Sequence, residues 1–368
     1  MNVFIRQLTG VRFVAAAWVV LYHYQIPLAA VGILTIPGVA DVLRVGRLGV
    51  DLFFALSGFI ITHTYLRRLG PALRARASLD FWWLRLARVY PVHLVMIVIA
   101  GTAVVAQAIL TGDALTKDWI NPLDLAKNLL LVQEWGPAPS RGWNFVAWSL
   151  SMEWLAYLLF PLLVLVLWRL HRRLPTWALL VAWMAVLTPL VALGLSTSDP
   201  YYTEHWGSTI RILTEFPAGA ITYLIVCRLL PGDRLSDPAP PKVERMATAL
   251  AVALPVLVVI GAVVLGQWPA AQPHQGELNG GGEAFPPYYH LLLVPLLVAW
   301  IGSLALTPRG VSRMLATRAL VLGGFISYSL YMTHLVWYGL WRAAMKALHV
   351  SEGPLYACLL YTSPSPRD

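Results

Sequence analysis

Long apolar runs follow one another along most of the chain, separated by shorter polar segments. An α-helix needs roughly 20 apolar residues to cross the hydrocarbon core of a bilayer. Nine runs reach this length, at residues 8–26, 48–66, 90–111, 145–168, 176–195, 209–230, 247–265, 288–306 and 319–341. A tenth run begins near Gly353 and stops early. The pattern predicts an all-α fold, a polytopic membrane helix bundle with nine visible spans and a truncated tenth.

Composition agrees with a single membrane domain. Hydrophobic residues make up 58% of the 368 residues and charged residues 12%, whereas an average soluble domain has about 25% charged residues. The first of the longer connections, around residues 112–144, contains DLAKNLLLVQEW, whose apolar spacing predicts a short interfacial helix. We expect residues 1–357 to form one integral-membrane domain without a soluble module on either end.

The last eleven residues, CLLYTSPSPRD, carry no helical apolar periodicity. One back-translation of this segment matches a transposase-based sequencing adapter. We therefore expect residues 358–368 to be a sequencing artefact and the natural tenth helix to continue after Ala357. Without this segment Cys227 is the only cysteine, which excludes an intramolecular disulfide.

The formal net charge of +9 is explained by where the basic residues lie. If the N-terminus is cytoplasmic, the inner segments hold more than twice as many Lys and Arg residues as the outer ones. Cytoplasmic loops of membrane proteins are enriched in these residues. The charge therefore predicts a multi-pass protein of the cell membrane with a cytoplasmic N-terminus, and we expect no nucleic-acid partner.

The first span contains two ionisable side chains, Arg12 and His23, in the stretch VRFVAAAWVVLYHY. At 3.6 residues per turn they lie within about 20° of each other around the helix and roughly 16 Å apart along it. Each such group costs roughly 2.5–3.5 kcal/mol inside hydrocarbon on insertion scales. This face of the helix is therefore expected to point into protein or water.

The second span, GVDLFFALSGFIITHTYL, places Asp51, Ala55, Gly58 and Thr62 on one face, while Ser57 points elsewhere. Small and polar residues on one face are typical of a close helix contact or of a cavity wall. Packing alone would explain Ala55 and Gly58, but an unpaired buried carboxylate such as Asp51 is costly.

Arg85 and Arg88 lie one turn apart beside Trp82, Trp83 and Tyr90, between the second and third apolar runs. Guanidinium groups bind phosphate oxygens through paired hydrogen bonds. The pair is a candidate phosphate site at the inner membrane surface. The alternative is that these residues only set the topology and contact anionic lipid.

The fourth span opens with WSLSMEW, in which Ser149, Glu153 and Tyr157 share one side. With this topology Glu153 lies at roughly the depth of His23. A carboxylate beside an imidazole orients the ring and raises its basicity, which prepares a general base. A structural ion pair is the alternative.

The ninth span, ISYSLYMTHLVWYGLW, carries a polar stripe of Ser327, Tyr331, His334 and Tyr338. Its histidine has two interpretations, a hydrogen-bonded packing residue or part of a site.

No His or Cys pair has helix-compatible spacing together with a third ligand, so no metal site is expected.

Five segments taken in order resemble one known family. They are LTGVRFVAAAWVVLYHY, GVDLFFALSGF, RLARVYP, WSLSMEW and ISYSLYMTH, and together they resemble the acyltransferase-3 family of integral-membrane acyltransferases. The resemblance implies an O-acyltransferase that takes an acyl group, such as acetyl, from cytoplasmic acyl-CoA. The acceptor would be a hydroxyl of a cell-surface glycan, a lipid or a glycosylated small molecule. It implies no cofactor beyond acyl-CoA as co-substrate, and leaves open a separate extracytoplasmic partner for a later transfer.

Carried over by motif, the resemblance implies Arg12 and His23 in the reaction centre, Ser57, Gly58 and Phe59 in the second-span motif, and Arg85 and Arg88 on the CoA side. Combined with the residue patterns, the expected catalytic residues are His23, Glu153 and Arg12. The expected substrate-binding residues are Arg85, Arg88, Asp51, Ser57, Gly58, Phe59, Tyr331 and His334.

The expected mechanism has His23, supported by Glu153, remove the proton of the acceptor hydroxyl as it attacks the thioester. Tyr331 or Arg12 would stabilise the oxyanion, and an acyl-enzyme relay is an alternative.

The rival function is a polytopic transporter, in which the same polar faces would line a substrate or proton path.

Overall fold

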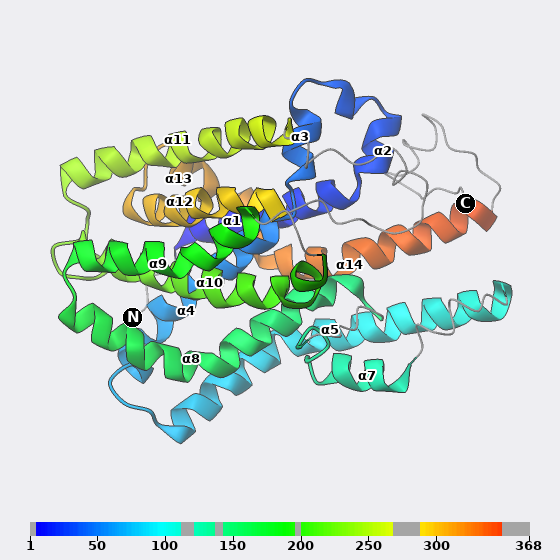
Figure 1. The fold of residues 1–368 in the computed structure, drawn as a ribbon, viewed down its shortest axis with the longest axis horizontal. Coiled ribbons are helices and arrows are strands. Elements are labelled where there is room, and N and C mark those ends of the chain that lie inside the picture. Colours follow the sequence, from blue (N-terminus) through cyan, green and yellow to red (C-terminus); the bar gives the residue numbers. More distant parts are fainter. Residues whose placement is uncertain (1–4, 112–120, 137–142, 196–199, 268–287, 348–368) are drawn as a thin grey trace.

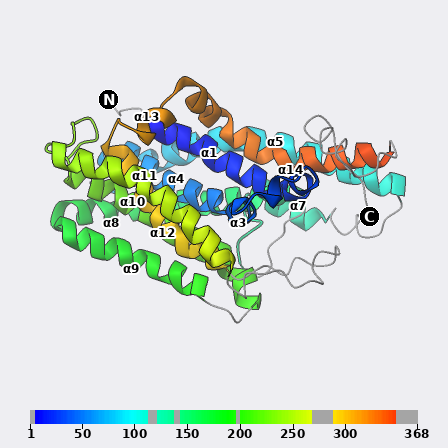
Figure 2. The same cartoon turned by 90° about the horizontal axis from the view of Figure 1, so that it is seen from above.

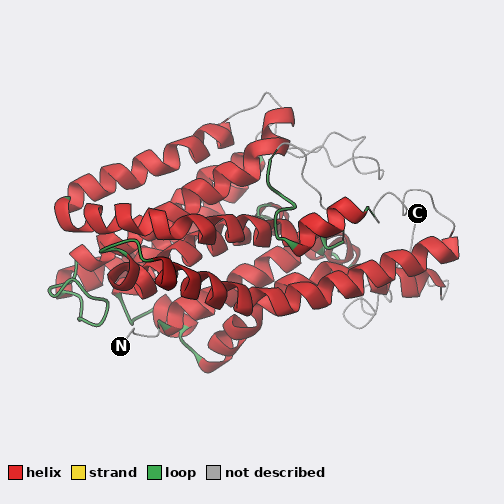
Figure 3. Cartoon of the chain, turned by 90° about the horizontal axis from the view of Figure 1, so that it is seen from below, coloured by secondary structure: helices red, strands yellow, loops and turns green. Residues whose placement is uncertain are grey.

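The computed structural model describes residues 5–111, 121–136, 143–195, 200–267 and 288–347. Every regular element in these ranges is a helix (Figure 3), which confirms the all-α fold. Eight helices in this part of the chain are long and apolar enough to cross a membrane. They are α4 (Leu48–Leu69), α5 (Ala75–Thr111), α8 (Trp148–Arg173), α9 (Thr176–Leu195), α10 (Pro200–Arg228), α11 (Pro241–Gly266), the run η5 (Tyr288–Leu293) with α12 (Val294–Leu306), and α14 (Arg318–Ala347).

The first predicted span forms α1 (Arg6–His23), but it is not among these eight helices. Its 18 residues include Arg6, Arg12 and His23, which lower its hydropathy. The helix packs chiefly against α14 and α4, so Arg12 and His23 are partly covered by protein, while Arg6 at its start is exposed. All nine predicted spans are thus helical, and the tenth lies outside the described residues.

The bundle has three mostly buried helices, α4, α10 and the η5–α12 run, and more exposed outer ones. Most of α4 and α10 is buried, whereas α9 and α11 expose most of their surface, and α9 follows one edge of the bundle in Figure 2. Long apolar side chains on α11, such as Val259 and Ile260, are exposed, as expected for a helix that faces lipid. Helices α5 and α14 extend toward the same end of the molecule (Figure 1).

Glycines allow α4 and α10 to approach closely. A Cβ atom at Gly58 would overlap the backbone oxygen of Phe216, and one at Gly219 would overlap that of Ala55. In reciprocal contacts of this kind, small residues take the place of large side chains at the interface, so the two helix backbones can approach closely. The face of small and polar residues on the second span therefore contacts α10 through Gly58 and Ala55. This close contact fixes the position of α4 against α10.

Short elements connect the long helices. They are α2 (Gln25–Ala30), η1 (Ile33–Thr35), α3 (Val39–Arg44), α7 (Pro122–Leu129), η2 (Phe145–Ala147) and α13 (Val311–Leu315). Helix α7 begins where the Asn121 side chain accepts a hydrogen bond from the Leu123 amide at 2.8 Å, as helix N-caps do. It confirms the predicted short helix in the first long connection.

Candidate active site

A cavity lies between α1, α4, α8 and α14. It is partly open, and its polar lining residues are Arg12, Ser149, Glu153, Tyr328 and Tyr331. The rest of its wall is apolar and comes mainly from α4, with one residue each from α8 and α14. The structure therefore brings together three predicted site residues from three different spans, Arg12, Glu153 and Tyr331. A largely apolar cavity with a few converging polar groups is typical of a small-molecule site.

Glu153 is held in place from two helices. The Ser57 hydroxyl on α4 donates to its Oε1 at 2.5 Å, and the Tyr157 hydroxyl, one turn along α8, donates to the same oxygen. Because both donors reach one oxygen, the carboxylate has little freedom to rotate. Ser57 belongs to the site through this bond, whereas its neighbours Gly58 and Phe59 do not line the cavity.

Arg12 is the cationic group of the cavity. Its guanidinium lies 5.7 Å from the centre of the Phe53 ring, and its Nε has no hydrogen-bond partner among the described residues. It lies near enough to Glu153, Arg85 and Arg88 for their charges to act on it. Three arginines around one carboxylate leave a local excess of positive charge, which favours an anionic or strongly dipolar ligand.

Arg85 and Arg88 continue this positive region along α5. The Arg85 guanidinium lies 5.7 Å from the centre of the Tyr65 ring, and its buried Nε has no partner among the described residues. Arg88 is exposed. The charges of both arginines thus act on Arg12, although neither residue lines the cavity.

His23 contacts α14 rather than Glu153. Its Nδ1 lies 3.0 Å from the Val19 carbonyl oxygen and 3.0 Å from Nε2 of His334. The Nδ1 of His334 in turn lies 2.6 Å from the Tyr331 carbonyl oxygen. Among the described contacts none joins His23 to Glu153, so the structure does not bring this expected pair together. It places His334, expected to bind substrate, directly against His23.

Tyr331 connects the histidines to the cavity. Its hydroxyl donates to the Val146 carbonyl at 3.0 Å and lies 2.8 Å from the Ser149 hydroxyl. Because the phenol proton is already donated to a backbone oxygen, Tyr331 is less available than Arg12 to stabilise an oxyanion. Tyr328, which is not among the predicted site residues, lies three residues earlier on α14 and also lines the cavity. Its hydroxyl donates to the Val89 carbonyl of α5 at 2.7 Å.

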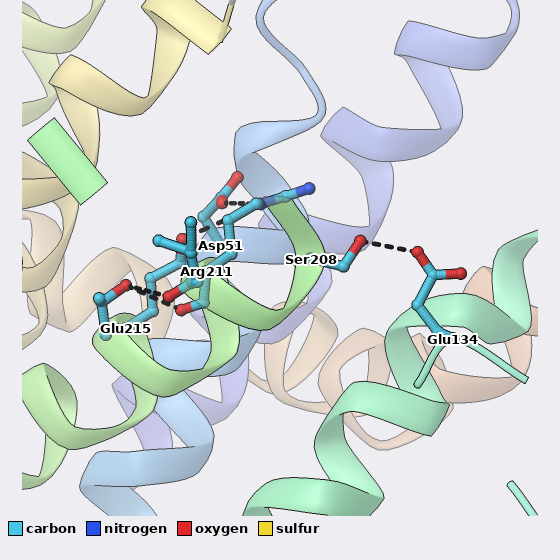
Figure 4. A network of polar contacts seen from close by, with 7 residues as sticks. Asp51, Glu134, Ser208, Arg211 and Glu215 are labelled. Atoms are coloured by element: carbon cyan, nitrogen blue, oxygen red, sulfur yellow. Dashed lines mark hydrogen bonds and ion pairs between the residues drawn. The ribbon is translucent and has the colours of Figure 1, made fainter. Parts of the chain in front are cut away.

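Asp51 lies in a separate charge cluster, shown in Figure 4. It is fully buried and accepts a hydrogen bond from Arg211 Nε on α10 at 2.8 Å, and Glu215 lies 4.0 Å from the same nitrogen. Beside it, Ser208 donates to Glu134 at 2.7 Å. Asp51 does not line the cavity, so the geometry favours a structural role for it over the expected substrate contact.

Comparison with known proteins gives the family. A family model described as an acyltransferase domain (Acyl_transf_3) matches residues 5–363. The chain is 31% identical over 239 residues to the acyltransferase MdmB of Streptomyces mycarofaciens, covering 60% of this chain and 57% of that protein. It is 25% identical over 337 residues to the O-acetyltransferase OatA of Staphylococcus aureus, covering 89% of this chain and 49% of that protein.

The chain thus spans about half the length of the curated relatives it matches. No solved structure matches it. Since the family model covers nearly all of the sequence, including the five segments that carry the resemblance, the chain belongs to the acyltransferase-3 family.

Proposed function

We propose that this protein transfers an acyl group, acetyl in the first instance, from acyl-CoA on the cytoplasmic side to a hydroxyl of a surface glycan, a lipid or a glycosylated small molecule. The observation that supports this most strongly is the cavity that joins Arg12, Glu153 and Tyr331 inside the bundle, with arginines on one side. The similarity to OatA, named as an O-acetyltransferase, supports acetyl as the group.

The donor enters from the side of Arg85 and Arg88. These residues bind the phosphates of CoA, and the narrower pantetheine arm brings the thioester into the cavity. A cytoplasmic N-terminus places both arginines on the inner side, in agreement with the distribution of basic residues. Glu153, fixed by Ser57 and Tyr157, partly balances the charge of Arg12.

The transfer needs a base and an oxyanion partner. His23 removes the proton of the acceptor hydroxyl while the hydroxyl oxygen attacks the thioester carbonyl carbon. The negative charge that develops on the carbonyl oxygen needs a hydrogen-bond donor close to His23, whereas Arg12, roughly 16 Å from His23 along the helix, attracts the anionic acyl-CoA deeper in the bundle. The carbon–sulfur bond then breaks, the CoA thiolate leaves, and it takes up the proton that His23 accepted. The products are an ester and free CoA.

The test uses the full chain in nanodiscs with radiolabelled acetyl-CoA, and membranes of the expression host supply glycans and lipids as acceptors. We expect free CoA to appear together with labelled acceptor, which a transporter would not produce. His23→Ala should bind acetyl-CoA normally but transfer it about 10²-fold or more slowly, as loss of a general base typically does. Transfer at the wild-type rate would remove His23 from the mechanism.

Donor binding is tested separately with Arg85→Ala/Arg88→Ala. This double variant should bind acetyl-CoA more weakly, and the loss should be larger at low salt because charges are screened less there. The matched control is Arg74→Ala/Arg76→Ala, which removes two exposed arginines near the start of the same helix. Equal loss in both double variants would mean that only the general positive charge of the segment matters.

A further inference from the structure

We propose that His334 is a positioning residue that fixes the protonation pattern of the His23 ring and leaves Nε2 of His23 free to act as the base. The proposal rests on the proposed function, in which His23 accepts the proton of the acceptor. It is carried by the contact between the two imidazoles, whose ring centres lie 4.9 Å apart. His334 is 97% buried, since only 3% of its surface is exposed.

The first step is the proton on His334. Its Nδ1 lies 2.6 Å from the Tyr331 carbonyl oxygen, and a carbonyl oxygen can only accept a hydrogen bond. Nδ1 of His334 therefore carries a proton. In a neutral imidazole the other nitrogen is then an acceptor, so Nε2 of His334 presents a lone pair to His23.

The second step is the proton on His23. Its Nδ1 faces two acceptors, the Val19 carbonyl oxygen and Nε2 of His334, each at 3.0 Å. Both contacts are hydrogen bonds only if Nδ1 of His23 is the donor. The proton of neutral His23 is thus on Nδ1, and its Nε2 is the unprotonated nitrogen that a general base needs.

A charged His334 would not fit these contacts. Its Nε2–H would point at Nδ1 of His23, which would then have to act as an acceptor while also facing the Val19 carbonyl oxygen. The positive charge would be buried, and Arg47 is near enough to act on His23 with a further positive charge. The neutral pair is the arrangement that satisfies every contact, and it introduces no charge into the bundle.

In this arrangement His334 has the role that a carboxylate has beside the catalytic histidine of many hydrolases. There, an acidic side chain accepts from Nδ1–H of the catalytic histidine and keeps the ring in the correct tautomer. Here the acceptor is a neutral imidazole, anchored through Tyr331. When His23 takes up a proton, the bond from its Nδ1–H to His334 becomes charge-assisted and strengthens.

The experiment compares two amide substitutions of similar polarity in the full chain. In His334→Gln the side-chain oxygen can reach the position of Nε2 and accept from His23. In His334→Asn the side chain is one methylene shorter and can reach only the position of Nδ1. We expect single-turnover acetyl transfer from acetyl-CoA to fall about 10- to 100-fold in His334→Asn and to stay within about threefold of wild type in His334→Gln, with donor binding unchanged in both.

Tyr24→Phe is the control, because the Tyr24 hydroxyl donates to the backbone oxygen of His334 at 3.0 Å, so the variant removes a contact to the same residue that does not involve its ring nitrogens. It should transfer at nearly the wild-type rate. Equal losses in His334→Gln and His334→Asn, or no loss in either, would overturn the proposal.

A second arm separates this proposal from the proposed function. If His334 acts only through His23, then His334→Asn should cause no further loss in a His23→Ala background. An undiminished loss in that background would show that His334 acts elsewhere. If His23→Ala alone leaves transfer intact, the proposed base is wrong. If His23→Ala is slow and His334→Asn is normal, only the positioning role fails.

Discussion

Replacing Arg211 with methionine tests whether the charge cluster between α4 and α10 stabilises the fold. Arg211 donates to Asp51 at 2.8 Å and lies 4.0 Å from Glu215, and both acidic residues are fully buried. Methionine removes the cation from two buried carboxyl groups at once. Breaking a buried ion pair from one side costs about 3–5 kcal/mol, so the free energy of unfolding should fall by about that amount.

The buried thiol of Cys227 provides the assay. In a Cys358→Ser background it is the only thiol of the chain, so a maleimide fluorophore reports unfolding of α10 during heating in detergent. We expect the midpoint to fall by about 5 °C or more. The control is Arg309→Met, which removes an exposed arginine from a contact to Glu244 and should cost at most about 1 kcal/mol.

A compensating variant adds Asp51→Asn and Glu215→Gln to Arg211→Met. Neutral amides no longer need a cation, so part of the lost midpoint should return. The reasoning is refuted if Arg211→Met unfolds at the wild-type temperature, or if the compensated protein is no more stable than the single variant.

Three further predictions concern the site and the topology. Ser57→Ala removes one hydrogen-bond donor from Glu153. Because hydrogen bonds to charged groups contribute about 1.5–3 kcal/mol, single-turnover transfer should slow about tenfold or more. Unchanged transfer would exclude Ser57 from the site. Gly58→Ala meets the Phe216 backbone and should lower the thiol-assay midpoint, as overpacking typically costs about 1–3 kcal/mol, whereas Gly339→Ala has open space and should not. A cysteine at Ala72 should be labelled by an impermeant maleimide only from the cytoplasmic side, and one at Gln275 only from outside; labelling of both from one side would contradict the orientation.

Hydropathy was sufficient to predict which segments are helical, because the bilayer imposes a minimum apolar length. It could not predict helix length beyond the hydrocarbon. The third span was expected to begin at residue 90, but α5 begins at Ala75, since backbone hydrogen bonds continue through the polar RASLDFWWLRLAR segment. The shortfall at α1 has a related cause: Arg12 and His23 are partly covered by neighbouring helices, chiefly α14 and α4, and a hydropathy window does not register neighbours.

The site was predictable in its members but less so in its pairings. The residue patterns predict Arg12, Glu153 and Tyr331 as site residues, and all three line one cavity, but the depth argument places Glu153 level with His23 rather than with Arg12. Depth does not give the rotation of a helix or its neighbour. His23 therefore meets His334 instead of Glu153, and the partner of Asp51 lies 160 residues away in sequence.

Tyr331 has consequences for engineering acyl-chain length. Its phenol forms part of the cavity wall, while its carbonyl oxygen accepts from His334, so cavity shape and histidine orientation share one residue. Variants that enlarge the cavity at Tyr331 would change the orientation of His334, and with it that of the base His23, whenever the backbone of α14 adjusts. Val50 and Leu150 line the same space from α4 and α8, and neither helix supplies a histidine to the pair. Truncating these two side chains is the route by which longer acyl donors should be accommodated while the base keeps its orientation.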